Sequence, residues 1–66
     1  MSDIGNLIRS ARRAKDISQK ELANELGVTD VTVSRYESNS VTIPSDKLIR
    51  IAELLDIPMT KMVQVR

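Results

Sequence analysis

The feature that most constrains the fold is a window over residues 19–38, in which small and apolar residues recur at fixed positions. A small residue occupies its fifth position (Ala23), a glycine its ninth (Gly27) and a β-branched residue its fifteenth (Val33). Two helices that cross steeply need a small side chain where they touch, and Gly27 can take the positive φ that ends the first of them. The window therefore predicts two short helices joined by a tight turn.

Residues that favour helix starts support this division of the window. Ser18 and Glu21 form a capping box, in which each side chain binds a free backbone N–H group of the other residue. Thr29 can cap the second helix with its hydroxyl group. The two helices are therefore expected over residues 18–26 and 29–37.

Outside this window, apolar residues at helical spacing predict three further helices, over residues 3–15, 45–55 and 58–63. Pro58 suits the first turn of the last helix, where its missing N–H group has no helical partner to lose. No alternation typical of β-strands occurs in the sequence. We predict an all-α fold, a compact bundle of five short helices in a single domain over residues 1–66.

The composition argues against several classes of function. The chain has 66 residues and contains no cysteine and no histidine, which excludes disulfides, thiolate chemistry and the usual zinc ligands. A domain of this size buries only about 60% of its unfolded surface, so a deep catalytic cleft is not expected. No apolar run approaches the roughly 20 residues of a membrane span. We expect neither an enzyme nor a metal or cofactor site, no membrane partner, and a cytoplasmic location.

The charge is distributed unevenly along the chain, although the net charge is only +1. Residues 1–20 carry five positive and two negative side chains, a balance of +3, and residues 21–66 carry five positive and seven negative, a balance of −2. Such asymmetry can create a basic face on a nearly neutral protein. An ordinary solvated helix face explains it equally well.

Five motifs cover most of the chain: I-R-S-A-R-R-A (8–14), I-S-Q-K-E-L-A (17–23), L-G-V-T (26–29), V-S-R-Y-E (33–37) and L-I-R-I-A-E-L-L (48–55). Over about residues 4–63 the chain resembles the phage-repressor and Cro type of helix-turn-helix protein, the Xre-like proteins found among bacterial and phage transcription regulators. The resemblance implies a lambda-repressor-like fold and sequence-specific binding of double-stranded DNA. A repressor-like regulator would read a palindromic operator through the major groove with helix 29–37. A protein-interaction or antitoxin module on the same fold is the alternative.

The outer side of helix 29–37 carries the residues predicted to contact bases. With Val33 and Tyr36 turned inward, five residues point outward or sideways, namely Asp30, Val31, Thr32, Ser34 and Arg35. Of these, Asp30, Val31, Thr32 and Arg35 are predicted to contact bases. Arg35 can form a bidentate pair with guanine, and Val31 can pack on a thymine methyl group. Asp30 has two open roles, which are to accept a hydrogen bond from cytosine or to stabilise the positive end of the helix.

Polar side chains around this helix are predicted to contact the DNA backbone, namely Gln19, Thr29, Ser34, Asn39, Ser40 and Thr42. Gln19 starts a helix whose N–H groups can hold a phosphate, and by resemblance it occupies a position that contacts the DNA backbone in phage repressors. An exposed glutamine without that role is the alternative. The loop over residues 38–43 is uncharged, whereas phage repressors often carry lysine and arginine there, so modest affinity is expected.

Five residues are assigned structural roles: Ala23, Gly27, Val33, Arg12 and Glu37. By resemblance, Arg12 and Glu37 match a pair that joins the first helix to the end of the recognition helix in phage repressors. A contact of Arg12 with a phosphate is the alternative. Removing one partner of a buried pair costs roughly 3–5 kcal/mol, and an exposed pair contributes about 0–1 kcal/mol. The sequence does not distinguish the two cases. Asp16 and Asp56 replace two glycines that end helices in the family.

The C-terminal end of the chain is rich in apolar residues, which are Ile57, Met59, Met62, Val63 and Val65. A short helix needs fewer than these to pack on a core, so we expect some of them to form a homodimer surface. A twofold dimer would present two recognition helices to half-sites about 34 Å apart. The alternative is that all five residues cover the core.

Overall fold

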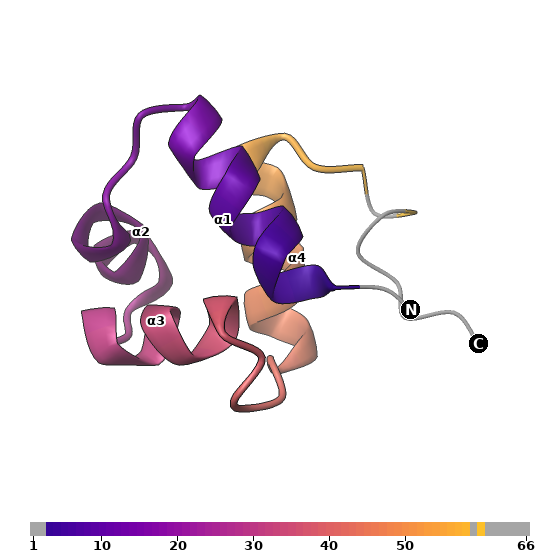
Figure 1. Ribbon diagram of the computed structural model, residues 1–66. Coiled ribbons are helices and arrows are strands. Elements are labelled where there is room, and N and C mark those ends of the chain that lie inside the picture. The colour runs from indigo at the N-terminus through magenta and orange to yellow at the C-terminus, as the bar shows by residue number, and fades with distance from the viewer. Residues whose placement is uncertain (1–2, 59, 61–66) are drawn as a thin grey trace.

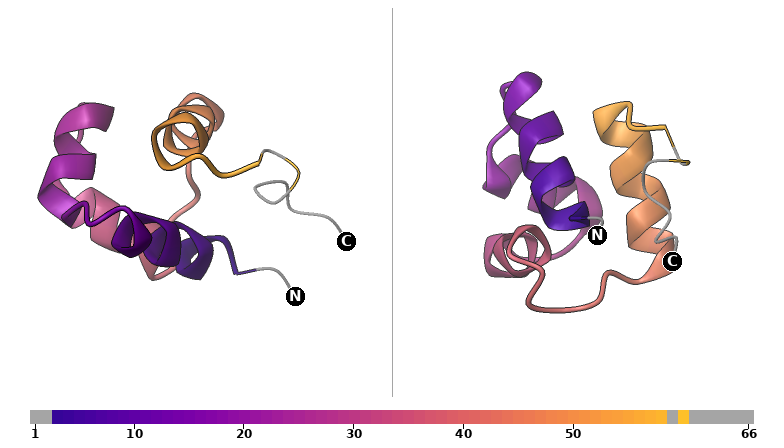
Figure 2. Two further views of the ribbon diagram at one scale, coloured as in Figure 1. Left: turned by 90° about the horizontal axis from the view of Figure 1, so that it is seen from above. Right: turned by 45° about the vertical axis from the view of Figure 1, so that its right-hand side comes forward.

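The computed structural model describes residues 3–58 and residue 60, and the fold is all-α, as predicted. The described residues form four helices, which are α1 (Ile4–Ala14), α2 (Gln19–Leu26), α3 (Asp30–Glu37) and α4 (Ser45–Leu55). Figure 1 shows α2 and α3 following one another through a short turn, with α1 in contact with α3. Figure 2 shows α1 and α4 next to one another. None of the helices in the described part of the chain has the length and apolar character of a membrane span.

The described residues form four of the five predicted helices. Asp56 ends α4 in the left-handed conformation (φ 55°), and the next two residues are not helical. The predicted fifth helix, over residues 58–63, falls mostly outside the described part of the chain. So do four of the residues predicted to form a dimer surface, which are Met59, Met62, Val63 and Val65.

The fifth of those residues, Ile57, belongs to the core and not to a surface. Its N–H group donates to the carbonyl oxygen of Ala52 at 2.9 Å, which turns the chain back after α4. The residue is 7% exposed and packs with the core side chains. The assignment of Ile57 to a dimer surface is therefore corrected.

The helices α2 and α3 and the turn between them have the local structure that the sequence predicts. Ser18 Oγ accepts from the Glu21 N–H group at 3.0 Å, and Glu21 Oε1 accepts from the Ser18 N–H group at 2.9 Å. Gly27 ends α2 with φ 71°. Thr29 Oγ1 accepts from the Thr32 N–H group at 3.2 Å and so caps α3. Local hydrogen bonds thus fix the starts of α2 and α3, and Gly27 forms the turn between the two helices.

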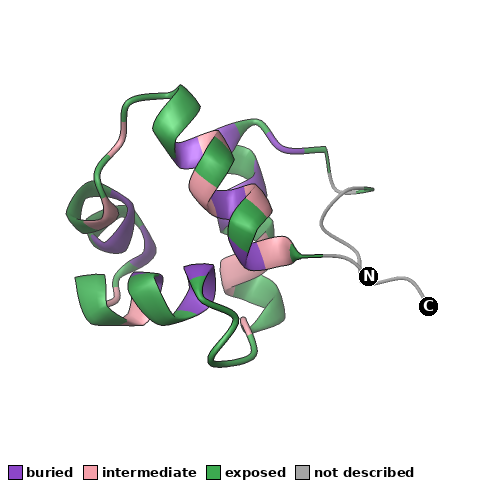
Figure 3. Cartoon of the chain, in the orientation of Figure 1, coloured by how far each residue is buried: buried purple, intermediate pink, exposed green. Residues whose placement is uncertain are grey.

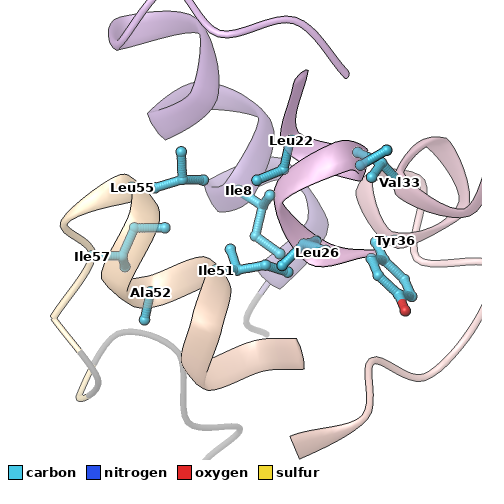
Figure 4. Packing of buried hydrophobic residues seen from close by; sticks show 10 residues of the cluster. Ile8, Leu22, Leu26, Val33, Tyr36, Ile51, Ala52, Leu55 and Ile57 are labelled. Atoms are coloured by element: carbon cyan, nitrogen blue, oxygen red, sulfur yellow. The ribbon is translucent and has the colours of Figure 1, made fainter. Parts of the chain in front are cut away.

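The core receives one fully buried side chain from each helix, which are Ile8, Leu22, Val33 and Ile51. In Figure 4 the side chains of Ile8, Leu22, Leu26 and Ile51 converge between α1, α2 and α4. Ala23 is 2% exposed and Tyr36 is 5% exposed, so both belong to the same cluster. The inward direction predicted for Val33 and Tyr36 is confirmed. The buried side of α3 is thereby held against α1 and α2, which leaves its other side to solvent (Figure 3).

Gly5 lies where α1 comes closest to the end of α3. A Cβ atom on Gly5 would lie 2.4 Å from the carbonyl oxygen of Glu37 and 2.7 Å from that of Tyr36. Both atoms belong to the backbone, so neither can move aside as a flexible side chain would. The approach of α1 to α3 therefore requires a glycine, a constraint that the sequence analysis missed.

Replacing Gly5 by alanine is expected to lower the free energy of unfolding by about 2–3 kcal/mol, because the added methyl group overpacks the crossing. Ser10→Ala, at an exposed position of the same helix, is the matched control and should change it by less than about 0.5 kcal/mol. Urea unfolding measures both variants. A Gly5→Ala protein as stable as the parent would contradict the close approach.

Aspartate occupies two helix ends at which the backbone is left-handed, with φ 59° at Asp16 and φ 55° at Asp56. This conformation is strained for residues with a Cβ atom, although aspartate tolerates it better than most. We expect Asp16→Gly to raise the free energy of unfolding by about 0.5 kcal/mol. Glycine removes the backbone strain, but it also loses more conformational entropy on folding than aspartate, which offsets part of the gain. Asp46→Gly, in the first turn of α4, should instead lower the free energy of unfolding by about 1 kcal/mol, because glycine disfavours the helix and the carboxylate at the helix N-terminus is lost. Thermal unfolding distinguishes them, and a less stable Asp16→Gly protein would contradict the strain.

Candidate nucleic-acid interface

The exposed side of α3 holds the residues predicted to contact bases. Asp30, Val31 and Arg35 are exposed, and Thr32 is half-buried. Val31 is 55% exposed, although it is an apolar residue at the first turn of a helix. The Thr32 hydroxyl lies 2.9 Å from the Thr29 hydroxyl, so the two side chains share a hydrogen bond at the start of α3. The structure thus brings these four residues together on one helix surface, and their contacts with bases stay predictions.

The residues predicted to contact the DNA backbone surround α3 on several elements. Gln19 is half-buried at the start of α2, whereas five residues are exposed, namely Thr29, Ser34, Asn39, Ser40 and Thr42. Ser40 Oγ lies 2.7 Å from Ser38 Oγ, and Ser38 Oγ donates to the Arg35 carbonyl oxygen at 3.2 Å. The loop after α3 is therefore ordered by hydroxyl groups in place of charged side chains.

Asn39 holds this loop against the start of α1. Its Oδ1 atom accepts from the Gly5 N–H group at 3.1 Å, and its Nδ2 atom donates to Asp3 Oδ1 at 2.7 Å. Asp3 Oδ1 also accepts from the Asn6 N–H group at 2.9 Å, which caps α1. The amide of Asn39, followed by the N–H group of Asn6, lowers the pKa of the Asp3 carboxyl group below its usual value. A phosphate contact by the Asn39 side chain would therefore depend on its second amide proton.

Sequence reasoning missed this role of Asn39, but a signal was present. Asn39 adopts φ 62°, and asparagine is among the few residues besides glycine that tolerate the left-handed region. An asparagine two residues after a helix end is typical of a tight reversal. Lys47 was missed as well: its Nζ atom donates to the Leu26 carbonyl oxygen at 3.0 Å and so joins α4 to the end of α2.

The Arg12–Glu37 pair is buried, which decides the question that the sequence left open. Arg12 is 8% exposed and Glu37 is 4% exposed. Arg12 Nε donates to Glu37 Oε2 at 2.6 Å, and Arg12 Nη2 donates to Glu37 Oε1 at 3.3 Å. Arg12 Nη1 donates to the Ile17 carbonyl oxygen at 2.7 Å. The guanidinium group thus joins α1, the turn before α2 and the end of α3.

Gln19 completes this cluster, since its Nε2 atom donates to Glu37 Oε1 at 3.1 Å. The residue predicted to contact a phosphate is therefore bonded to the buried ion pair. The sequence gives no local indication of this bond, because 18 positions separate the two residues.

In the described part of the chain no group of three metal-ligating side chains comes together.

Comparison with known proteins agrees with this geometry. Residues 8–62 match the sequence profile of a family described as helix-turn-helix. The chain belongs to the helix-turn-helix family of the Cro/C1 type. Its helix-turn-helix unit is α2, the turn at Gly27 and α3.

Two solved structures and one curated protein illustrate the similarity of this helix-turn-helix domain to others. The P22 c2 repressor, in complex with a synthetic operator, superposes with a TM-score of 0.87 over 97% of both chains at 22% identity. SinR, the master regulator for biofilm formation, in complex with DNA, has a TM-score of 0.78 and 32% identity over 92% of this chain and 98% of that one. An inferred HTH-type transcriptional regulatory protein of Methanocella arvoryzae is 45% identical over 83% of this chain. This chain spans only 17% of the length of that relative.

Removing the Glu37 carboxylate from this helix-turn-helix domain is expected to be strongly destabilising. Glu37→Ala leaves the buried guanidinium of Arg12 without its charge partner, which should lower the free energy of unfolding by about 3–5 kcal/mol. Replacing both residues together, as Arg12→Met with Glu37→Met, removes the unpaired charge and should recover most of that loss. Urea unfolding compares the two proteins. Equal stability of the single and double variants would contradict the coupling of the pair.

Proposed function

We propose that this domain binds double-stranded DNA sequence-specifically, as the DNA-binding part of a repressor-like transcriptional regulator. The observation that carries the proposal is the two-sided character of α3. Val33 and Tyr36 anchor one side in the core, and Val31 and Arg35 lie exposed on the helix. A helix held in this way can enter a major groove as a rigid unit.

The chemistry of the exposed side of α3 supports direct reading of bases. Arg35 offers two parallel N–H donors to O6 and N7 of guanine, and the Val31 side chain offers an apolar contact to a thymine methyl group. Both contacts are possible only in the major groove, where these base atoms are exposed. We propose Asp30 and Thr32 as the neighbouring base contacts at the start of the helix.

The backbone of the DNA would be held from the two ends of this surface. Gln19 and the first N–H groups of α2 would form one contact, and Thr29, which caps α3, and Ser34, which lies on α3, would form others. The uncharged loop supplies hydroxyl and amide donors from Asn39, Ser40 and Thr42. A full regulator would bind a palindromic operator as a twofold dimer, with half-sites one helical turn apart. Similar proteins support this proposal, since the P22 c2 repressor and SinR have been crystallised with DNA.

The alternative is that the same exposed side of α3 binds another protein, as in an antitoxin or adaptor. Val31 is as suitable for an apolar protein contact as for a thymine methyl group. The two functions differ in their response to salt, because binding to DNA releases counterions from phosphates and weakens steeply as salt rises. Binding to random-sequence duplexes at two salt concentrations therefore separates them.

Replacing Arg35 by alanine is expected to weaken binding to the preferred duplex by about 1–3 kcal/mol and to relax base preference at one position of each half-site. Arg50→Ala, which removes the same charge from an exposed position on α4, is the matched control and should leave the preferred sequence unchanged. Selection of duplexes from a random pool by each protein gives the preferences. An unchanged motif for Arg35→Ala would contradict direct reading by this residue.

A further inference from the structure

We infer that Glu37 is a positioning residue for the phosphate contact of Gln19, and that the buried ion pair thereby determines DNA affinity as well as fold stability. This inference rests on the proposed function, since it assumes that Gln19 contacts a DNA phosphate. It concerns a single hydrogen bond, from Gln19 Nε2 to Glu37 Oε1 at 3.1 Å.

The Glu37 carboxylate determines which atom of the Gln19 amide faces inward. A carboxylate only accepts hydrogen bonds, so the amide nitrogen must face it and the amide oxygen must face elsewhere. The carboxylate is itself fixed by hydrogen bonds, since Arg12 donates to both of its oxygen atoms. The Glu37 side chain is 3% exposed. The orientation of the Gln19 amide is thus set by a buried acceptor whose two oxygen atoms are both bonded to Arg12.

This orientation matches what a phosphate requires. The amide nitrogen carries two protons in one plane, so when one points at Glu37 the other points away from it. Within the described residues, no acceptor is bonded to that second proton. A phosphate also only accepts hydrogen bonds, so an amide turned the other way would present an oxygen atom and repel it. Glu37 therefore selects the orientation that binds.

Ordering before binding adds to this effect. A free glutamine side chain has several rotatable bonds, and fixing them on binding opposes association. In this domain Gln19 is half-buried and bonded before any DNA arrives, so much of that ordering has already occurred. Loss of the Glu37 acceptor should then weaken DNA binding through Gln19, even where the fold survives.

The test is a double-mutant cycle on DNA binding. Gln19→Ala is measured in two backgrounds, the parent domain and the Arg12→Met/Glu37→Met variant, which keeps the net charge and removes the acceptor. In the parent, Gln19→Ala should weaken binding about tenfold, the effect of one lost hydrogen bond. In the variant background it should weaken binding less than about threefold, because the amide is no longer oriented. An equal loss in both backgrounds overturns the inference.

A second ion pair supplies the matched control. Arg50→Met with Glu53→Met also removes one positive and one negative charge, from an exposed pair on α4 that does not contact Gln19. Gln19→Ala should keep its full tenfold effect in that background. A reduced effect there as well would show that the cycle reports general perturbation, and would overturn the assignment to Glu37.

The outcomes also separate this inference from the proposed function. Failure of the parent domain to bind any duplex defeats the proposed function and with it the inference. Binding by the parent that is unaffected by Gln19→Ala defeats the inference alone. If the Arg12→Met/Glu37→Met variant does not fold, NMR of the parent domain without DNA tests the inference instead. The inference is supported if one proton of the Gln19 side-chain amide has a chemical shift typical of a hydrogen bond and the amide shows restricted motion. A freely mobile amide overturns it.

Discussion

Glu37 carries a carboxylate with a side chain that is only 3% exposed, and a charge in such a place is tolerated only where donors surround it. Its donors come from two other segments, Arg12 on α1 and Gln19 at the start of α2. The relative placement of α1, α2 and α3 therefore depends on one carboxylate, since moving any of the three breaks a hydrogen bond to it. Gly5 makes the same arrangement possible, because α1 reaches the end of α3 only where no side chain intervenes.

The ends of the helices show a compromise between strain and local bonding. Asp16 and Asp56 take left-handed conformations that glycine adopts more easily. Asp56 is compensated in part, since Lys15 Nζ lies 2.6 Å from its Oδ2 atom and joins the end of α1 to the end of α4. Both side chains are substantially exposed, so water and salt screen the pair and its contribution is about 0–1 kcal/mol. The fold therefore does not depend on this pair as it does on the buried one.

The features that the sequence predicted well are formed by residues close to one another in the chain. The capping box, the positive φ of Gly27 and the helical spacing of core residues each involve positions a few residues apart, and the structure contains all three. What it missed joins distant positions. Gly5 faces Glu37, Asn39 binds Gly5, and Gln19 binds Glu37, and no periodic pattern marks such contacts. Burial of the Arg12–Glu37 pair was unknowable for the same reason, because it depends on how α1 and α3 are placed.

The composition of the surface around α3 bears on how the proposed complex would discriminate among sequences. The loop after α3 carries no charge, so its phosphate contacts would come from hydroxyl and amide groups. Such contacts release fewer counterions than lysine or arginine would, and non-specific binding, which depends mainly on that release, is weakened most. The proposed contacts of Val31 and Arg35 with bases would keep their full value, because they would depend on shape and hydrogen bonds. A nearly neutral domain can therefore bind DNA weakly and still select its site well, provided that Gln19 keeps the hydrogen bond to Glu37 that orients its amide.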